Sequence, residues 1–352
     1  MLLITHQCNL RCSYCYEPKK AKHTMTFDNA KQYIEKAVSS LDDSFDSFEI
    51  QYMGGEPLMQ FPLIQEVSEW LWNSNFDKKL EHIFAPTNGT LLDDRQKQWF
   101  SINKERICLG LSFDGNRLMQ NINRTDSFAK VDLDFFLSTW PNQSIKMTVS
   151  PQTLPYLYDG VSYLHNFGFK YIVADLAMGN NVEWRHEDLQ IIDKQLSLLS
   201  DFYLKNPDVP CVSLLNKDLS LVISTEANRK KCSCGESLQC IDYDGEVYAC
   251  HLFSPVSVSL EEARKSQRMD YTDYSSFKPK VCGDCLLYPL CPTCYGMNFK
   301  CYGNIAEQPP SVCSTTKIIF LANCEFQIRR AYAKDDKSKV ELINNIVSLI
   351  EL

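Results

Sequence analysis

The sequence predicts an α/β fold: a partial (β/α)6 barrel, followed by a small cysteine-rich domain and a C-terminal helix. Three observations carry this prediction. Apolar segments of strand length alternate with helix-like segments six times within residues 1–205. Polar or glycine-containing loops follow the early strands. Eleven of the sixteen cysteines lie from Cys232 to Cys324, and only Cys108 and Cys211 separate that region from Cys15.

The strand–helix alternation predicts a parallel sheet with helices outside it. The expected strands are 2–5, 48–52, 82–85, 107–113, 145–149 and 171–177. The expected helices are 26–41, 62–71, 93–102, 126–139, 157–167 and 187–204. Thr26 is suited to cap the first helix, Pro62 to open the second and Gly168 to end the fifth. Six units are fewer than the eight that close a full barrel, so we expect a partial one.

The chain beyond the barrel, which we place at 1–205, divides into three segments. A linker is expected at 206–230, because it opens with a proline-containing run. The cysteine-rich domain should span 231–325 and the C-terminal helix 326–352. The apolar residues of that helix fall at helical spacing: Val340, Ile343, Ile346, Val347 and Ile350. We expect this stripe to pack back on the body of the protein, with a partner helix as the alternative.

Composition and charge exclude several classes of partner. The net charge is −8 and the pI is near 5.4, which argues against a nucleic-acid groove and against binding to acidic membrane surfaces. The apolar N-terminal run is too short for a signal peptide, and no apolar run has membrane-spanning length. We therefore expect a cytoplasmic protein without nucleic-acid or membrane partners. In a reducing cytosol, sixteen cysteines indicate metal binding rather than disulfides.

The first candidate metal site is the loop after the first strand. Cys8, Cys12 and Cys15 have the spacing C-x3-C-x2-C, with the aromatic Tyr14 before the last cysteine. A zinc site would need a fourth ligand nearby, and the next cysteine is Cys108. Three thiolates and an open position suit a [4Fe–4S] cluster with one iron free. The motif resembles the signature of the radical SAM superfamily, which implies that this iron holds the amino and carboxylate groups of S-adenosylmethionine.

A glycine pair after the second strand extends the resemblance. Gly54-Gly55-Glu56-Pro57 is similar to the family segment that binds the methionine amino group. Close backbone approach requires glycine, and the Glu56 carboxylate is suited to an ammonium group. The alternative is that Glu56 only caps the next turn.

The end of the fourth strand carries further candidates. The segment 111–115 resembles a strand of sulfatase and peptide maturases in the family, which implies that Ser112 contacts the ribose or carboxylate of the cofactor. The same resemblance implies that Arg124 pairs with that carboxylate. Asn88, Asp114 and Tyr14 are further candidates, although Asn88 and Asp114 are also typical turn residues. Because these loops all follow strand ends, they should line one mouth of the barrel.

The C-terminal cysteines resemble the SPASM extension, which holds two auxiliary [4Fe–4S] clusters. The resemblance implies a first ligand set of Cys234, Cys240, Cys250 and Cys294, and a second set of Cys282, Cys285, Cys291 and Cys313. Cys291 and Cys294 are separated by two residues, where the family usually has three. Cys301 is therefore an alternative to Cys294, as Cys232 is to Cys234 and Cys324 to Cys313. A pair of zinc sites is the alternative for the whole region.

The resemblance implies reductive cleavage of S-adenosylmethionine by one of three [4Fe–4S] clusters, with an electron donor such as flavodoxin or ferredoxin. The auxiliary domain is typical of enzymes that act on peptides. We interpret the chain as a maturase that installs a thioether or carbon–carbon cross-link in a ribosomally made precursor peptide. Because the cluster motif starts at Cys8, we expect no N-terminal leader-binding domain. Leader binding would use the barrel surface, the C-terminal helix or a separate protein.

Three other functions compete with this interpretation. A sulfatase maturase would make formylglycine, and in that group an aspartate base follows the G-x4-C cysteine. His251 stands at that position here and is a candidate proton acceptor. Other SPASM chemistry is the second rival. The third is a non-enzymatic iron–sulfur carrier or zinc-bound module, which would have no need of Gly54, Ser112 or Arg124.

Overall fold

The protein is represented by a computed structural model that describes residues 1–17, 20–224 and 230–350. Residues 225–229 of the expected linker and the last two residues of the expected C-terminal helix lie outside this description. The chain forms two compact units. The first unit comprises Met1–Ser112, Arg124–Gln143 and Ser233–Thr272, and the second comprises Phe113–Asn123, Ser144–Cys232 and Asp273–Leu352. Each unit combines distant segments, and the domain boundaries at 205, 230 and 325 remain predictions.

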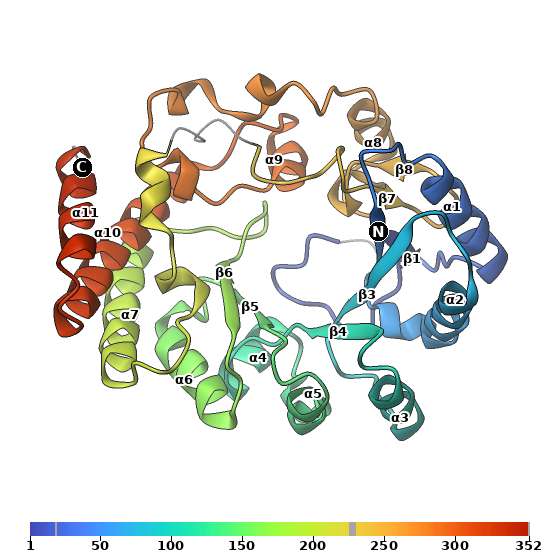
Figure 1. The fold of residues 1–352 in the computed structure, drawn as a ribbon, viewed down its shortest axis with the longest axis horizontal. Helices are drawn as coiled ribbons and strands as arrows, with labels where there is room; N and C mark the ends of the chain where they lie inside the picture. Colours follow the sequence, from blue (N-terminus) through green and yellow to red (C-terminus); the bar gives the residue numbers. More distant parts are fainter. Residues whose placement is uncertain (18–19, 225–229, 351–352) are drawn as a thin grey trace. The chain divides into compact units, whose positions relative to one another are not determined.

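The first unit contains a sheet with the strand order β4-β3-β2-β1-β7-β8. The strands are β1 (Leu2–Thr5), β2 (Ser47–Gly54), β3 (Lys79–Thr87), β4 (Ile107–Leu111), β7 (Cys240–Ile241) and β8 (Val247–Tyr248). All neighbours are parallel except the β7–β8 pair. The helices are α1 (Phe27–Ser39), α2 (Phe61–Asn73), α3 (Asp94–Ile102), α5 (Leu133–Thr139) and α8 (Leu260–Ser266). Short 3₁₀ turns are η1 (Pro57–Gln60), η2 (Phe128–Lys130) and η6 (His251–Phe253). Figure 1 shows α1 and α2 lying next to one another beside the strands.

Local sequence explains these elements. All residues of β1 and β4 are buried, as expected for parallel strands that are covered on both faces. Cys108 is one of them. Thr26 caps α1 by accepting a hydrogen bond from the Asn29 amide at 3.3 Å. The sheet and its helices confirm the α/β fold class.

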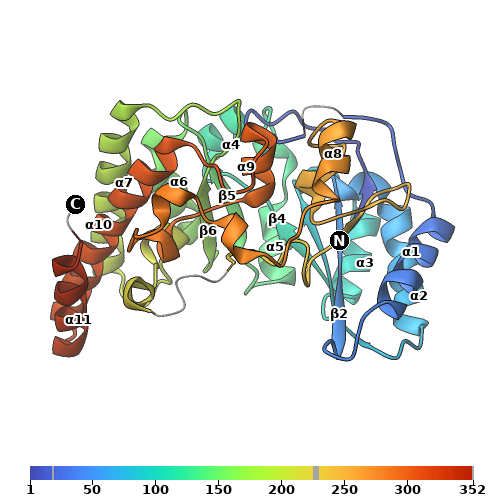
Figure 2. The ribbon, with the colours of Figure 1, turned by 90° about the horizontal axis from the view of Figure 1, so that it is seen from above.

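The second unit contains the parallel pair β5 (Ile145–Val149) and β6 (Ile172–Leu176). Its helices are α4 (Arg117–Asn123), α6 (Leu157–Phe167), α7 (His186–Lys205), α9 (Tyr295–Tyr302), α10 (Pro310–Ala333) and α11 (Lys337–Ser348). Short 3₁₀ turns occupy Leu154–Tyr156, Ser213–Leu215, Leu219–Ile223, Tyr274–Phe277, Lys280–Cys282 and Tyr288–Leu290. Helices α7 and α10 lie side by side in both views (Figures 1 and 2).

The apolar stripe near the C-terminus packs within the second unit. Ile343 and Ile346 are fully buried in a cluster with Leu219 and Phe320, and Ile350 packs against that cluster. The prediction that this stripe packs back on the protein is therefore confirmed for Ile343, Ile346 and Ile350, whereas Val347 is 38% exposed. None of the helices within the described ranges is both long and apolar enough to cross a bilayer.

Two expectations about the elements are wrong, and one strand pairing was not expected. The predicted helix 126–139 does not form as one element. Asp126, with a φ of 49°, cannot begin a right-handed helix, and Val131 and Asp132 are extended. A 3₁₀ turn covers Phe128–Lys130, and Leu133–Thr139 is the α-helix there. The expected C-terminal helix 326–352 is not one helix. Helix α10 begins at Pro310, since proline favours the first helical position, and α11 is separate from it, because Asp335 between them has a φ of 54°. The strand pair β7–β8 joins the sheet of β1, which the strand–helix alternation did not indicate.

Candidate functional site

The cysteine loop follows β1 directly in the first unit. Cys8, Cys12 and Cys15 are all half-buried. The Leu10 amide donates to Cys8 Sγ at 3.5 Å, and Lys20 Nζ donates to Cys15 Sγ at 3.2 Å. Burial raises the pKa of Cys8, while the Leu10 amide and the Lys20 charge oppose this rise. Both donors favour thiolates, which are the ligand form of cysteine.

Two pairs of contacts fix the loop between the cysteines. Asn9 Oδ1 accepts from the Asn88 amide group at 2.9 Å, and Asn9 Nδ2 donates to Thr90 Oγ1 at 2.7 Å. Thr125 Oγ1 donates to the Arg11 carbonyl at 3.0 Å and accepts from the Arg11 amide at 3.3 Å. The predicted site residue Asn88 thus positions the cysteine loop.

Gly54 and Gly55 lie against the start of the cysteine loop. A Cβ atom at Gly55 would lie 2.4 Å from the Gln7 carbonyl oxygen and 2.8 Å from Cys8 Cβ. A Cβ atom at Gly54 would lie 2.5 Å from the Thr5 carbonyl oxygen. These distances leave no room for a side chain, so the close approach requires glycine at both positions.

Glu56 is only 1% exposed and joins two segments, the turn after β2 and the end of β3. Its Oε1 accepts from the Leu58 amide at 3.0 Å and from Thr87 Oγ1 at 2.8 Å, and its Oε2 accepts from the Asn88 amide at 2.8 Å. Burial raises the pKa of Glu56, and these hydrogen bonds lower it, as does the charge of Arg124. Glu56 therefore caps the turn that begins at the buried Pro57, which was the alternative role.

Arg124 also lies in the first unit and is 7% exposed. Its guanidinium carbon lies 5.4 Å from the centre of the Tyr14 ring. Ser112 follows β4, and its amide donates to the Thr87 carbonyl at 2.8 Å. Since the Arg124 charge also acts on Glu56, the fold brings an arginine, an aromatic ring and a buried carboxylate into one neighbourhood.

Asp114 belongs to the second unit and is fully buried there. Its carboxylate accepts from the Thr148 amide at 2.8 Å and from Asn123 Nδ2 at 3.2 Å. These contacts tie α4 to β5, so Asp114 has a structural role in the second unit. Its predicted contact with the cofactor remains a prediction.

Three of the four cysteines predicted for the first auxiliary set lie in the first unit. Cys234, Cys240 and Cys250 are all buried, around the β7–β8 pair. The pKa of Cys240 is raised by burial and further by the charge of Cys250. Burial also raises the pKa of Tyr271, and the charges of Cys234 and Cys250 add to that effect. These effects indicate that the three thiols are neighbours.

His251 follows Cys250 and opens the turn η6. The centre of its ring lies 5.1 Å from that of Tyr16. Burial lowers the pKa of His251 to about 4, so its imidazole is uncharged at neutral pH. Its Nδ1 is buried and has no hydrogen-bond partner among the residues that the structure describes.

The second auxiliary set lies within the second unit. Cys282, Cys285, Cys291 and Cys313 all belong to it, and burial followed by the charges of the other three thiolates raises the pKa of Cys282. Cys324, the alternative to Cys313, is instead 4% exposed within the apolar cluster beneath α11. Burial there raises the pKa of Cys324 to about 11.

Cys294, predicted for the first auxiliary set, also lies in the second unit and immediately precedes α9. Its pKa is raised by burial and by the charges of Cys232 and Cys301. Both alternative ligands, Cys232 and Cys301, are therefore neighbours of Cys294, whereas Cys234 belongs to the first unit. Within the described part of the chain, no three His, Cys, Asp or Glu side chains are grouped so that they could hold one metal ion.

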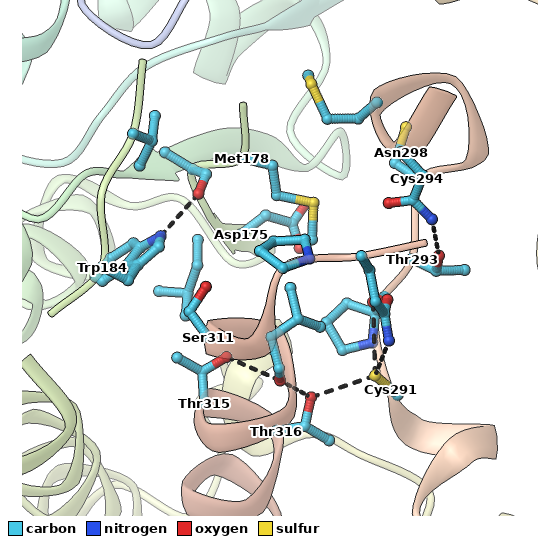
Figure 3. A pocket seen from close by; sticks show the side chains of 18 of the residues that line it. Asp175, Met178, Trp184, Cys291, Thr293, Cys294, Asn298, Ser311, Thr315 and Thr316 are labelled. Carbon is cyan, nitrogen blue, oxygen red and sulfur yellow. Dashed lines mark hydrogen bonds between the residues drawn. The ribbon is translucent and has the colours of Figure 1, made fainter. Parts of the chain in front are cut away.

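A cavity of about 690 Å³ lies within the second unit (Figure 3). It follows the carboxyl end of β6, where parallel α/β folds bind ligands. Met178, Trp184, Cys291, Cys294 and Thr316 contribute to its lining. Its volume falls in the range of pockets that bind small molecules or peptide side chains.

Sequence reasoning missed several residues that build the site. Thr87, Asn9 and Thr125 position Glu56 and the cysteine loop. Thr87 directly precedes Asn88 at a strand end, and this position was a usable signal. Thr125 had no such signal, because its partner Arg11 is distant in the sequence.

Comparison with known proteins gives consistent results. The model of the Radical SAM superfamily matches residues 2–132. An uncharacterized protein of Methanocaldococcus jannaschii is 30% identical over 216 residues, which cover 58% of this chain and 73% of that protein. A cysteine-type anaerobic sulfatase-maturating enzyme of Clostridium perfringens is 25% identical over 321 residues, which cover 81% of this chain and 84% of that protein.

Two solved structures share the fold. Native anSMEcpe with bound AdoMet superposes with a TM-score of 0.70 at 20% identity, covering 98% of this chain and 99% of that one. Streptococcus suis SuiB bound to precursor peptide SuiA gives a TM-score of 0.59 at 15% identity, and the match covers 89% of this chain and 74% of that one.

The contact at Gly55 generates a prediction about cluster loading. Gly55→Ala should displace Cys8 through its new Cβ atom and lower the iron content of reconstituted protein by about four per chain, one cluster's worth. Iron analysis together with circular dichroism measures this loss in a folded protein. Gly303→Ala is the control for backbone strain alone: its Cβ meets nothing within 4 Å, but its φ of 67° disfavours alanine, so it should lower stability without removing this iron. Full iron in the Gly55 variant would contradict the prediction.

Proposed function

This chain belongs to the radical SAM superfamily, and on that premise we propose that it is a peptide maturase. Its substrate is a ribosomally made precursor peptide, in which it installs an intramolecular thioether or carbon–carbon cross-link. The observation that carries the proposal is the cavity of the second unit, which has the size for a peptide side chain and is lined by Cys291 and Cys294. A substrate held there would lie beside the cysteines proposed to bind auxiliary clusters.

The cysteines of the first unit have the chemistry and the motif spacing that the cofactor of the family needs. Cys8, Cys12 and Cys15 would hold a [4Fe–4S] cluster, because they offer three half-buried thiols and no fourth protein ligand in the motif. When bound and reduced by a donor such as flavodoxin or ferredoxin, the cluster supplies the electron that cleaves S-adenosylmethionine to a hydrogen-abstracting 5′-deoxyadenosyl radical. Arg124, beside the Tyr14 ring, would pair with the cofactor carboxylate, and Ser112 would contact its ribose or carboxylate. Gly54, Gly55 and Glu56 would bind its amino group.

The thiols of the C-terminal region would hold two auxiliary clusters. Cys282, Cys285, Cys291 and Cys313 are neighbours and offer an all-thiolate set, which suits an iron–sulfur cluster. Cys234, Cys240, Cys250 and Cys294 would hold the other cluster, with Cys232 and Cys301 as substitutes. Two zinc ions in their place remain the alternative.

Sulfatase maturation is the second candidate. It is supported by the 25% identity to the Clostridium perfringens sulfatase-maturating enzyme over most of both chains. The position that holds the aspartate base in that group is His251, whose ring lies against Tyr16. The missing carboxylate favours cross-linking over formylglycine formation, and His251 is the proposed proton acceptor if a base is needed.

The two candidate functions are distinguished by the product. Reconstituted protein with a co-expressed precursor peptide should yield a product that has lost two hydrogens, because a cross-link removes one from each partner. Tandem mass spectrometry should show fragments held together across the link. An aldehyde-reactive hydrazide should leave this product unlabelled. Labelling would instead identify formylglycine and reject cross-linking.

Arg124 should contribute to cofactor binding. Charge-assisted hydrogen bonds to a carboxylate contribute roughly 1.5–3 kcal/mol, so Arg124→Ala should weaken S-adenosylmethionine binding by about tenfold or more. Arg124→Lys keeps the charge but loses the bidentate geometry, and it should show a smaller loss. Equilibrium binding to reconstituted protein with unchanged iron content measures both. An unchanged dissociation constant in the alanine variant would reject this role.

Matched serine variants on α10 separate a ligand from a core residue. Cys313→Ser should remove one auxiliary cluster, about four irons of a total of about twelve. Cys324→Ser should keep all the iron but lower the free energy of unfolding by roughly 1–3 kcal/mol, because it buries a hydroxyl in an apolar cluster. Iron analysis and urea denaturation measure the two effects. The reverse pattern would make Cys324 the ligand.

A further inference from the structure

Three side chains donate hydrogen bonds to Cys291, two to its sulfur and one to its carbonyl. Gln308 Nε2 and Thr316 Oγ1 each donate to Cys291 Sγ at 3.5 Å, and Figure 3 shows Thr316 beside the sulfur. Lys231 Nζ donates to the Cys291 carbonyl at 2.6 Å and also to the Tyr288 carbonyl. All of these residues belong to the second unit.

The donors around Cys291 suit a cysteine that ligates iron. As a thiol, Cys291 also donates to the Pro292 carbonyl at 3.7 Å. A ligating thiolate has no proton, so this contact is lost and the sulfur only accepts. The amide of Gln308 then faces the sulfur with its nitrogen, which is the chemically favourable orientation. Thr316 is the weaker donor, because its single hydroxyl proton is shared with the Val312 carbonyl at 2.6 Å.

Donors and cations around a cluster shift its reduction potential. A reduced cluster carries one more negative charge than an oxidised one, so hydrogen bonds to its sulfur ligands stabilise the reduced form more. Lys231 adds a half-buried cation next to the same ligand, and its Nζ lies 3.9 Å from the centre of the Tyr288 ring. All three donors therefore act in the same direction.

We propose that Gln308, Thr316 and Lys231 act through Cys291 to raise the reduction potential of the second auxiliary cluster. They are tuning residues that act through the cysteine ligand, and all three also line the cavity proposed for the substrate. This inference rests on the proposed function, because that function supplies the cluster.

The chain offers a matched control for this proposal. Thr315 and Thr316 are adjacent on α10 and similarly buried, and both hydroxyls donate to the Val312 carbonyl. Only the Thr316 hydroxyl has a described contact with Cys291 Sγ. Thr315→Val and Thr316→Val therefore remove the same group from the same helix, with and without the sulfur contact.

The experiment is a redox titration monitored by electron paramagnetic resonance on reconstituted full-length protein. A background with Cys8, Cys12 and Cys15 changed to alanine removes the first cluster's signal. The signal that disappears when Cys282→Ala and Cys285→Ala are added belongs to the second auxiliary cluster.

Gln308→Leu should lower the equilibrium constant for reduction of this cluster by about threefold to tenfold, where tenfold is a shift of 59 mV for one electron. Thr316→Val should give a smaller fall in the same direction, and Thr315→Val should give none. Unchanged potentials in both test variants, with full iron, would overturn the inference. An equal shift in the Thr315 variant would also overturn it, by showing a structural effect. A wild-type protein without this cluster would reject the proposed function itself, and iron analysis distinguishes that result.

Discussion

The buried carboxylate of Glu56 is the interaction on which the first unit's site depends. It accepts three hydrogen bonds, one from a residue after β2 and two from residues at the end of β3, and the adjoining Gly55 packs against the beginning of the cysteine loop. A buried carboxylate without such donors would be strongly unfavourable, so its position requires all three. The loop that carries Cys8, Cys12 and Cys15 is therefore held by the sheet edge and not by regular structure of its own.

The second unit handles its cysteines differently. Cys282, Cys285 and Cys291 lie among short 3₁₀ turns, and Cys313 lies on α10. Few backbone hydrogen bonds of regular structure fix the first three relative to one another. Ligands gathered from such segments are best ordered by what they bind, so metal binding and folding should be coupled here. The long helices α7 and α10, by contrast, have the hydrogen bonds of regular structure, so they can form the stable part of this unit.

The sequence was sufficient to predict the elements that have strong local signals. The apolar runs of β1 and β4 and the cap at Thr26 were predicted, as was the C-terminal end of α6 at Gly168, whose φ is 122°. The left-handed conformation of Thr125 was not predicted, because a β-branched residue rarely adopts it. In the site, the need for glycine at Gly55 was predicted, but its close contact is with the chain itself. The hydrogen bonds that hold Asn9 and Arg11 join residues distant in the sequence, so no local pattern predicted them.

The pairing of β1 with β7 has a consequence for the order of events during synthesis. Leu2 pairs with Ile241, so one edge of the first strand stays open until most of the chain has left the ribosome. An open edge next to reactive thiols invites wrong strand pairing and premature oxidation. Pairings this distant also slow folding. The nascent chain therefore has a long interval in which a chaperone or an iron–sulfur carrier would find the loop accessible.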